Sequence, residues 1–198
     1  MARLRKFTAY RTKERPYTRF SKFKNKSYVR TKPACHVVRF DQGDLTKIFP
    51  VYLTLQSKEG FYQIRDNAIE SARQSCNRYL EKHIPGNFSL KVRLYPHHMI
   101  RENPLASGAG ADRMSTGMAH SFGKVIGIGA QIPREGNPII TVGVERAHLP
   151  VARMALKRAS YKLPFSYKMV ETKSFETKAG QAKAQIEKKT VEVAKKAK

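Results

Sequence analysis

The chain has 198 residues, with 39 Lys and Arg against 15 Asp and Glu, which gives a formal net charge of +24. This length fits one compact domain with tails. A charge surplus of this size opposes compaction by self-repulsion, so it predicts a densely anionic partner, and nucleic acid fits best. No apolar run approaches the roughly 20 residues that span a bilayer, and neither a signal peptide, a lipid anchor nor a basic amphipathic helix is evident, so we expect no membrane partner.

Residues 1–33 are expected to form a basic, aromatic RNA-binding arm. They hold twelve Lys or Arg against one acid, Glu14, and six interleaved aromatic residues, but almost no aliphatic ones. A disordered solubilising tail would explain the charge alone, whereas the aromatic residues favour an arm that stacks on RNA while cations meet phosphates. The predicted RNA-binding residues of the arm are Arg3, Arg5, Lys6, Arg11, Lys13, Arg15, Arg19, Lys22, Lys24, Lys26, Arg30 and Lys32.

Residues 34–170 are expected to fold as the globular domain, because their apolar residues are regularly spaced. A short strand is predicted over 35–40, followed by a turn at 41–44 and a half-buried strand over 49–57. The spacing of Ile64, Ala68, Ala72, Cys76 and Tyr79 predicts a helix from Phe61 to Lys82 that ends before Pro85-Gly86. The small residues Ala68, Ser71, Ala72 and Ser75 predict close packing of this helix on a sheet.

The second half of this domain alternates strands and one more helix. In "FSLKVRLYP" (88–96) we expect Leu90, Val92 and Leu94 to point inward and Lys91 and Arg93 outward. The further predictions are a glycine-rich strand over 123–132, a hairpin turn at 134–137, a strand over 138–144, a helix over about 147–162 with Arg153, Lys157 and Arg158 outside, and a strand over 165–170.

The order of these elements predicts an α+β domain with a mostly antiparallel sheet and two packed helices. Residues 171–198 hold eight Lys and four Glu with few large apolar groups, and are expected to be a lysine-rich tail. Only Cys35 and Cys76 are present. Without a Cys-x-x-Cys pair we expect two buried thiols in a reducing compartment, and neither a disulfide nor a zinc site.

No catalytic arrangement emerges from the remaining motifs. The glycine stretch "SGAGADRMSTG" (107–117) has Arg113 where a dinucleotide fingerprint needs its third glycine, and it lacks the Gly-Lys-Ser/Thr of a P-loop. His97 and His98 point to opposite sides of an extended segment, so they and Glu102 do not share a metal ion easily. Nothing brings Ser107, Asp112 and His120 together as a nucleophile triad. We therefore expect no enzyme activity and no cofactor.

The glycine stretch is instead surrounded by basic residues. A loop of small residues exposes its backbone, and basic flanks suit a phosphate chain, although a surface loop without a role is the competing interpretation. The residues of this cluster are Arg93, His97, His98, Arg101, Arg113, His120 and Lys124. Of these, Arg93, His97, His98 and Lys124 join the predicted RNA-binding set.

Several motifs together resemble one protein family. "QIRDNAIESARQSCNRYLEK", "LKVRLYPHHMIREN", "GAGADRMSTGM" and "SFGK" resemble the large-subunit ribosomal protein family L-ten-e, the archaeal and eukaryotic counterpart of bacterial L-sixteen. The similarity runs in order from Arg15-Pro16-Tyr17 through "FDQGDL" and "FPVYLTL" to "KLP" (162–164). It covers most of the chain.

The resemblance implies an α/β-hammerhead type of α+β domain that is a structural part of the cytoplasmic ribosome and forms no homo-oligomer. Its partners would be large-subunit rRNA near 5S rRNA, tRNA in the P and A sites, neighbouring ribosomal proteins and late subunit maturation factors. Loop 101–117 would reach towards the acceptor end of P-site tRNA. The tRNA-proximal residues would be Arg101, Glu102, Asn103, Ser107, Gly108, Gly110, Asp112 and Arg113.

The sequence departs from the family pattern at three places. Ala119-His120 follows Gly117-Met118 where the family often has Arg, and Gln131 stands at a later Arg position. The first dozen residues differ from the eukaryotic start, which favours an archaeal-type protein. The alternative to a structural ribosomal protein is an RNA-binding assembly factor that is not retained in the mature subunit.

Overall fold

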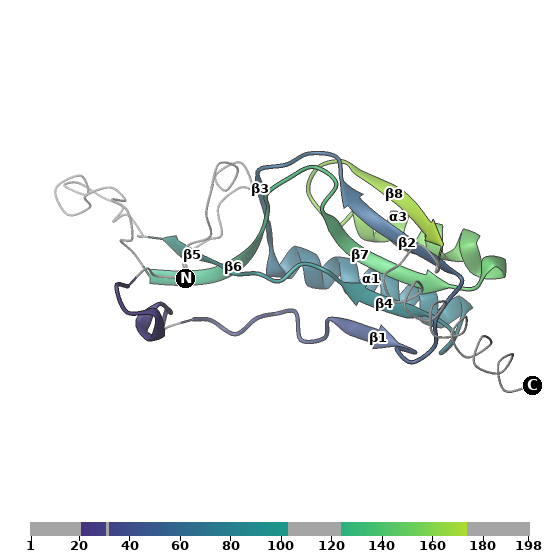
Figure 1. Cartoon of the computed structure of the whole chain (residues 1–198), viewed down its shortest axis with the longest axis horizontal. Coiled ribbons are helices and arrows are strands. Elements are labelled where there is room, and N and C mark those ends of the chain that lie inside the picture. Colours follow the sequence, from purple (N-terminus) through teal and green to yellow (C-terminus); the bar gives the residue numbers. More distant parts are fainter. Residues whose placement is uncertain (1–20, 31, 103–123, 174–198) are drawn as a thin grey trace, which may run out of the picture.

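The computed structural model describes residues 21–30, 32–102 and 124–173. They form two antiparallel sheets and two helices arranged along one long axis, with the smaller sheet at one end (Figure 1). All the described strand pairs are antiparallel. The α+β prediction with two packed helices is therefore confirmed.

The larger sheet has five strands in the order β1-β4-β7-β2-β8. Its strands are β1 (Asp41–Gly43), β2 (Val51–Ser57), β4 (Ser89–Val92), β7 (Pro138–Val144) and β8 (Tyr167–Lys173). Side chains of β2 alternate between buried and half-buried, because successive residues face opposite sides of a sheet. We call the side against the helices the inner face and the opposite side the outer face.

The inner face packs on α1 (Asp66–His83) and α3 (Leu149–Ser160), and η3 (Arg146–His148) precedes α3. Leu53, Leu90 and Val142 belong to the same buried cluster as Ala72 of α1 and Ala155 of α3. The small side chains let the helices approach each other and the sheet closely. Ser71 is exposed, so the predicted stripe of small packing residues is only partly correct.

The smaller sheet has the order β3-β6-β5, with β3 (Tyr62–Arg65), β5 (His98–Glu102) and β6 (Lys124–Ile132). Residues 62–65 are therefore a strand and not the predicted first turn of the helix, because they pair with residues 129–132 of β6. A turn does lie near 134–137, where Gly136 has φ +74°. It joins two sheets, so the expected hairpin between β6 and β7 is wrong.

The beginning of the domain also differs from the prediction. Residues 35–40 form no strand, and the expected turn at 41–44 contains β1 instead. Side-chain bonds explain the difference: His36 donates its backbone N–H to Asp66 Oδ2 (3.2 Å), and the guanidinium of Arg73 donates to Gln42 Oε1 (2.6 Å). These bonds hold the segment against α1 and bring residues 41–43 beside β4.

Most of the other elements lie close to their predicted positions, but β5 was not expected, and its last two residues, Arg101 and Glu102, were assigned to the loop 101–117. Strands β2, β4, β6 and β7 and helix α3 fall inside the expected ranges, while β8 begins two residues later and continues to Lys173. Cys76 is fully buried and Cys35 half-buried, and both are free thiols, so one of the two expected buried thiols is confirmed. No helix of the described segments has the length and apolar character needed to cross a membrane.

Candidate nucleic-acid interface

The connection between β4 and β5 carries a row of cationic and aromatic side chains. Along this extended segment Arg93, Tyr95 and His97 are exposed, while Leu94 and Pro96 between them are buried. The alternation of exposed and buried side chains therefore continues past the end of β4, and the exposed side chains lie on one side of the chain. The two sheets are joined here, in the middle of the long axis (Figure 1).

Tyr95 is the centre of this row. Its ring stacks on Phe40 with a centroid distance of 5.5 Å and an interplanar angle of 27°, and contacts His97 at 4.7 Å. The ammonium of Lys32 lies 5.4 Å from the Tyr95 centroid and donates to the Tyr95 hydroxyl (3.4 Å). We call Lys32, Phe40, Tyr95 and His97 the cationic–aromatic row. Tyr95 remains 43% exposed, so its ring is accessible to a base.

The described part of the arm leads directly into this row. Residues 21–30 contain no buried side chain, and η2 (Lys24–Lys26) is a single exposed turn. Phe23 is 62% exposed with the ammonium of Lys26 5.2 Å from its ring centroid. Cations and open aromatic faces together are the combination that binds single-stranded RNA. The predicted arm residues that are described, namely Lys22, Lys24, Lys26, Arg30 and Lys32, are all exposed.

The cluster around the glycine stretch is only partly brought together. Lys124 and His97 are exposed, Arg101 is half-buried, and His98 is only 6% exposed. The neighbouring histidines thus face opposite ways, as expected, and His98 belongs to the packing of the small sheet. Arg3 to Arg19 of the arm, and Asn103, Ser107, Gly108, Gly110, Asp112, Arg113 and His120, lie outside the described residues.

We did not predict from the sequence that Tyr95 lies at the centre of the row, nor that Phe40 stacks on its ring. The signal was present in the alternation of Lys91, Arg93, Tyr95 and His97, which places four polar or aromatic side chains on one side of an extended chain. The partners Lys32 and Phe40 come from a distant segment and had no local signal. They are brought close because residues 36–42 are bound to α1.

Two acidic side chains of α1, Asp66 and Glu70, are engaged inside the domain. Arg73 forms a two-pronged ion pair with Glu70, and these hydrogen bonds hold the pKa of the Glu70 carboxyl below its ordinary value. Asp66 accepts from the His36 ring at 2.6 Å. No group of three His, Cys, Asp or Glu side chains among the described residues could hold a metal ion.

The fold and this surface define a small, strongly basic α+β protein with side chains suited to RNA. A family model described as ribosomal protein L16p/L10e matches residues 12–170. The chain therefore belongs to the L16p/L10e family of ribosomal proteins, as its motifs indicated. As a member of this family it is a structural constituent of the large ribosomal subunit and not an enzyme.

Similar proteins come from archaea. The large ribosomal subunit protein uL16 of Archaeoglobus fulgidus is 42% identical over 172 residues, which is 86% of this chain and 94% of that protein. The uL16 of Methanocella arvoryzae is 42% identical over 168 residues, with 82% and 96% covered. The uL16 of Methanococcus maripaludis strain C5 is 43% identical over 175 residues, with 87% and 96% covered.

Proposed function

We propose that the chain binds large-subunit rRNA through the arm of residues 1–33 and the cationic–aromatic row. The observation that carries this proposal is the exposed Tyr95 ring with Lys32 and His97 beside it. An RNA base stacks on such a ring while the adjacent cations meet its phosphates. Lys22, Lys24, Lys26, Arg30, Arg93 and Lys124 extend the positive surface on both sides of the row.

Binding of the chain to a labelled large-subunit rRNA fragment tests this proposal. Tyr95→Ala should weaken binding by about 5- to 100-fold, the usual range for one stacked base, whereas Tyr95→Phe keeps the ring and should bind nearly as the wild type. Tyr161→Ala is the matched control, because Tyr161 is 72% exposed at the end of α3 and its side chain makes no described hydrogen bond. Equal losses for Tyr95→Ala and Tyr161→Ala would show that the row is not the contact.

We also propose that loop 101–117 reaches towards the acceptor end of P-site tRNA, in the corridor between 5S rRNA and the tRNA sites. The supporting observation is that β5 and β6 pair as far as Glu102 and Lys124, at the end of the long axis (Figure 1). The chain between them thus leaves from one extremity of the molecule. Neighbouring ribosomal proteins and late maturation factors would contact the same end, in the cytoplasm.

Shortening residues 104–112 tests the position of the loop. Because β5 and β6 are already paired where the loop leaves them, the unfolding curve should stay nearly the same while peptide-bond formation or subunit maturation falls. Unchanged translation and maturation would contradict the proposal.

The alternative, an assembly factor that leaves the mature subunit, makes a different prediction in a sedimentation experiment. A structural protein should remain with the large subunit in a one-to-one ratio through high-salt washing. Recovery of the chain mainly in the free fractions would favour the assembly factor.

A further inference from the structure

The outer face of the five-stranded sheet is not covered by α1 or α3, and it contains a groove of about 460 Å³. We call this the outer-face groove; the lining residues that matter here are Tyr52, Thr54, Gln56, Lys91, Arg93 and Thr141. Its volume lies in the range of sites for small ligands, about 300 to 1,000 Å³. From its composition we infer that it is a second RNA contact, which receives one unpaired nucleotide.

The floor of the groove carries both donors and acceptors of hydrogen bonds. Thr54 of β2 and Thr141 of β7 stand opposite each other in the register, and their hydroxyls lie 3.2 Å apart. Gln56 is two residues further along the same side of β2 and adds an amide. A base edge presents donors and acceptors together, so hydroxyls and an amide complement it, whereas a plain apolar ligand would leave the Gln56 amide, which makes no described hydrogen bond, without a partner.

One wall of the groove is positively charged. Lys91 and Arg93 come from the same side of the β4 chain, and Arg93 Nε donates to Thr141 Oγ1 at 3.3 Å. Among the described residues no acid forms an ion pair with either one, although Asp41 stands opposite Lys91 in the register. These two cations are therefore available for a phosphate group.

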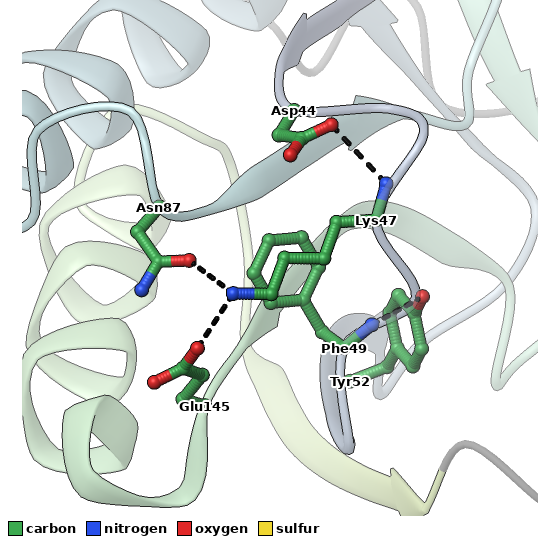
Figure 2. A network of polar contacts seen from close by, with 6 residues as sticks. All are labelled: Asp44, Lys47, Phe49, Tyr52, Asn87 and Glu145. Carbon is green, nitrogen blue, oxygen red and sulfur yellow. Dashed lines mark hydrogen bonds and ion pairs between the residues drawn. The ribbon is translucent and has the colours of Figure 1, made fainter.

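Lys47, at another edge of the groove, has a different role. Its ammonium donates to Glu145 (2.6 Å) and to Asn87 (2.8 Å), as Figure 2 shows. The same ion pair, together with a hydrogen bond between Asn87 and Glu145 itself, holds the pKa of the Glu145 carboxyl below its ordinary value. This network fixes the 44–49 segment beside the sheet, and it leaves the positive charge of the groove on the Lys91 side.

Tyr52 is held in a defined position at the end of the groove. Its hydroxyl accepts the backbone N–H of Phe49 at 3.3 Å (Figure 2). Its ring and the Ser89 hydroxyl occupy the space beside Gly143, where an added Cβ would lie 2.5 Å from Ser89 Oγ and 2.7 Å from ring carbon Cε1. A glycine near the end of β7 is thus explained by these two side chains, and the ring is a preorganised apolar wall for a base.

The groove is also continuous with the proposed rRNA contact, on which this inference rests. Lys91, Arg93, Tyr95 and His97 project from the same side of one extended segment. A single RNA strand that stacks on Tyr95 therefore passes Arg93 and reaches the groove with its next unstacked nucleotide. The limited volume admits a base that has left its helix, and does not admit a duplex.

The test compares two fluorescein-labelled RNA hairpins that differ only by one bulged nucleotide, made with each of the four bases in turn. At one fixed salt concentration the wild-type chain should bind at least one bulged hairpin about tenfold more tightly than the paired hairpin. The double substitution Thr54→Val with Thr141→Val keeps the side-chain shapes and removes the hydroxyls, so it should abolish most of this preference. A circular dichroism spectrum checks that the variant is folded.

Charge is tested with a matched pair. Lys91→Gln should weaken binding of the bulged hairpin several-fold more than Lys157→Gln, which removes the same charge from the exposed side of α3. A 4-thiouridine at the bulge should crosslink on irradiation to residues 52–56 or 89–93. Crosslinks confined to other segments would overturn the inference.

The two proposals fail in different ways. If bulged and paired hairpins bind equally while Tyr95→Ala weakens both, the groove is not a nucleotide site and the proposed rRNA contact stands. If the preference persists in the threonine double variant, the bulge is bound elsewhere and the inference about the groove is wrong. If neither hairpin binds and Tyr95→Ala changes nothing, the proposed rRNA contact itself is wrong.

Discussion

Deleting residues 1–30 should reduce the salt dependence of RNA binding without unfolding the domain. Each phosphate contact made by a cation adds about 0.7 to 0.9 to the slope of log binding constant against log salt concentration. The deletion removes eleven Lys or Arg, of which Lys22, Lys24, Lys26 and Arg30 are described and exposed. The slope should therefore fall by about 3 to 4 if only these four make contacts, and by about 8 to 10 if all eleven do.

The domain should keep its stability, because residues 21–30 bury no side chain and Val37 is the first buried residue among those that the structure describes. Retaining Lys32 preserves its contact with Tyr95. Fluorescence anisotropy with a labelled rRNA fragment at five or more salt concentrations gives the slope, and thermal unfolding gives the Tm of both proteins. An unchanged slope would refute the reasoning that the arm neutralises phosphates. A large fall in Tm would show that the arm is instead part of the packed domain.

Three further predictions concern the domain itself. Tyr62→Phe removes hydroxyl bonds to Ser57 and Tyr167 and should lower the free energy of unfolding by about 1–2 kcal/mol, measured by urea denaturation. Hydrogen bonds from Arg73 lower the pKa of Glu70 from 4.5, so this pair stabilises the folded state above about pH 4.5, and its contribution is lost as the pH falls through the folded-state pKa. In unfolding curves measured from pH 7 to 3, the free energy of unfolding of Glu70→Gln should therefore decrease less on acidification than that of the wild type. Burial raises the pKa of Cys76 to about 12, so a thiol reagent at pH 8 should modify Cys35 first and reach Cys76 only in urea; equal rates in the native protein would contradict this.

The long alternating strands and the helices could be predicted because their patterns are local. In residues 51–55 and 90–92 every second side chain is apolar and buried, and α3 buries Ala152, Ala155, Leu156 and Ala159 as its period requires. Strand β3 could not be predicted from the sequence because Ile64 continues the apolar spacing of the following helix. Residues 62–65 form a strand because they pair with residues 129–132 of β6. These partners lie about 67 positions later in the sequence, so no local pattern indicates the pairing.

Strand β1 is a second element that the local sequence does not indicate. Its sequence, Asp-Gln-Gly, reads as a turn, and Gly43 does have φ +79°. A side chain at 43 is excluded because an added Cβ would lie 2.1 Å from the carbonyl oxygen of Phe88. The glycine therefore serves a close approach of two strands, and the contact that decides between turn and strand comes from Arg73 and Phe88 in other elements.

Ion pairs inside the domain engage several acidic side chains, and this leaves the surplus positive charge on other parts of the surface. Several acidic side chains are paired with basic side chains of the same domain: Asp66 with His36, Glu70 with Arg73, Glu145 with Lys47, and Glu171 with Arg153. These pairs fix the start of α1, the β1 segment, the 44–49 segment and β8, so they are not available to neutralise the outer face. Lys32 of the row and Lys91 and Arg93 of the groove form no described ion pair, whereas Lys47 at the other edge of the groove is paired with Glu145. The helices cover only the inner face, so these cations remain on the surface and repel one another. An anion that lies along β4 and its continuation to β5 would relieve this repulsion best. An RNA strand that runs from the row to the groove would follow this path.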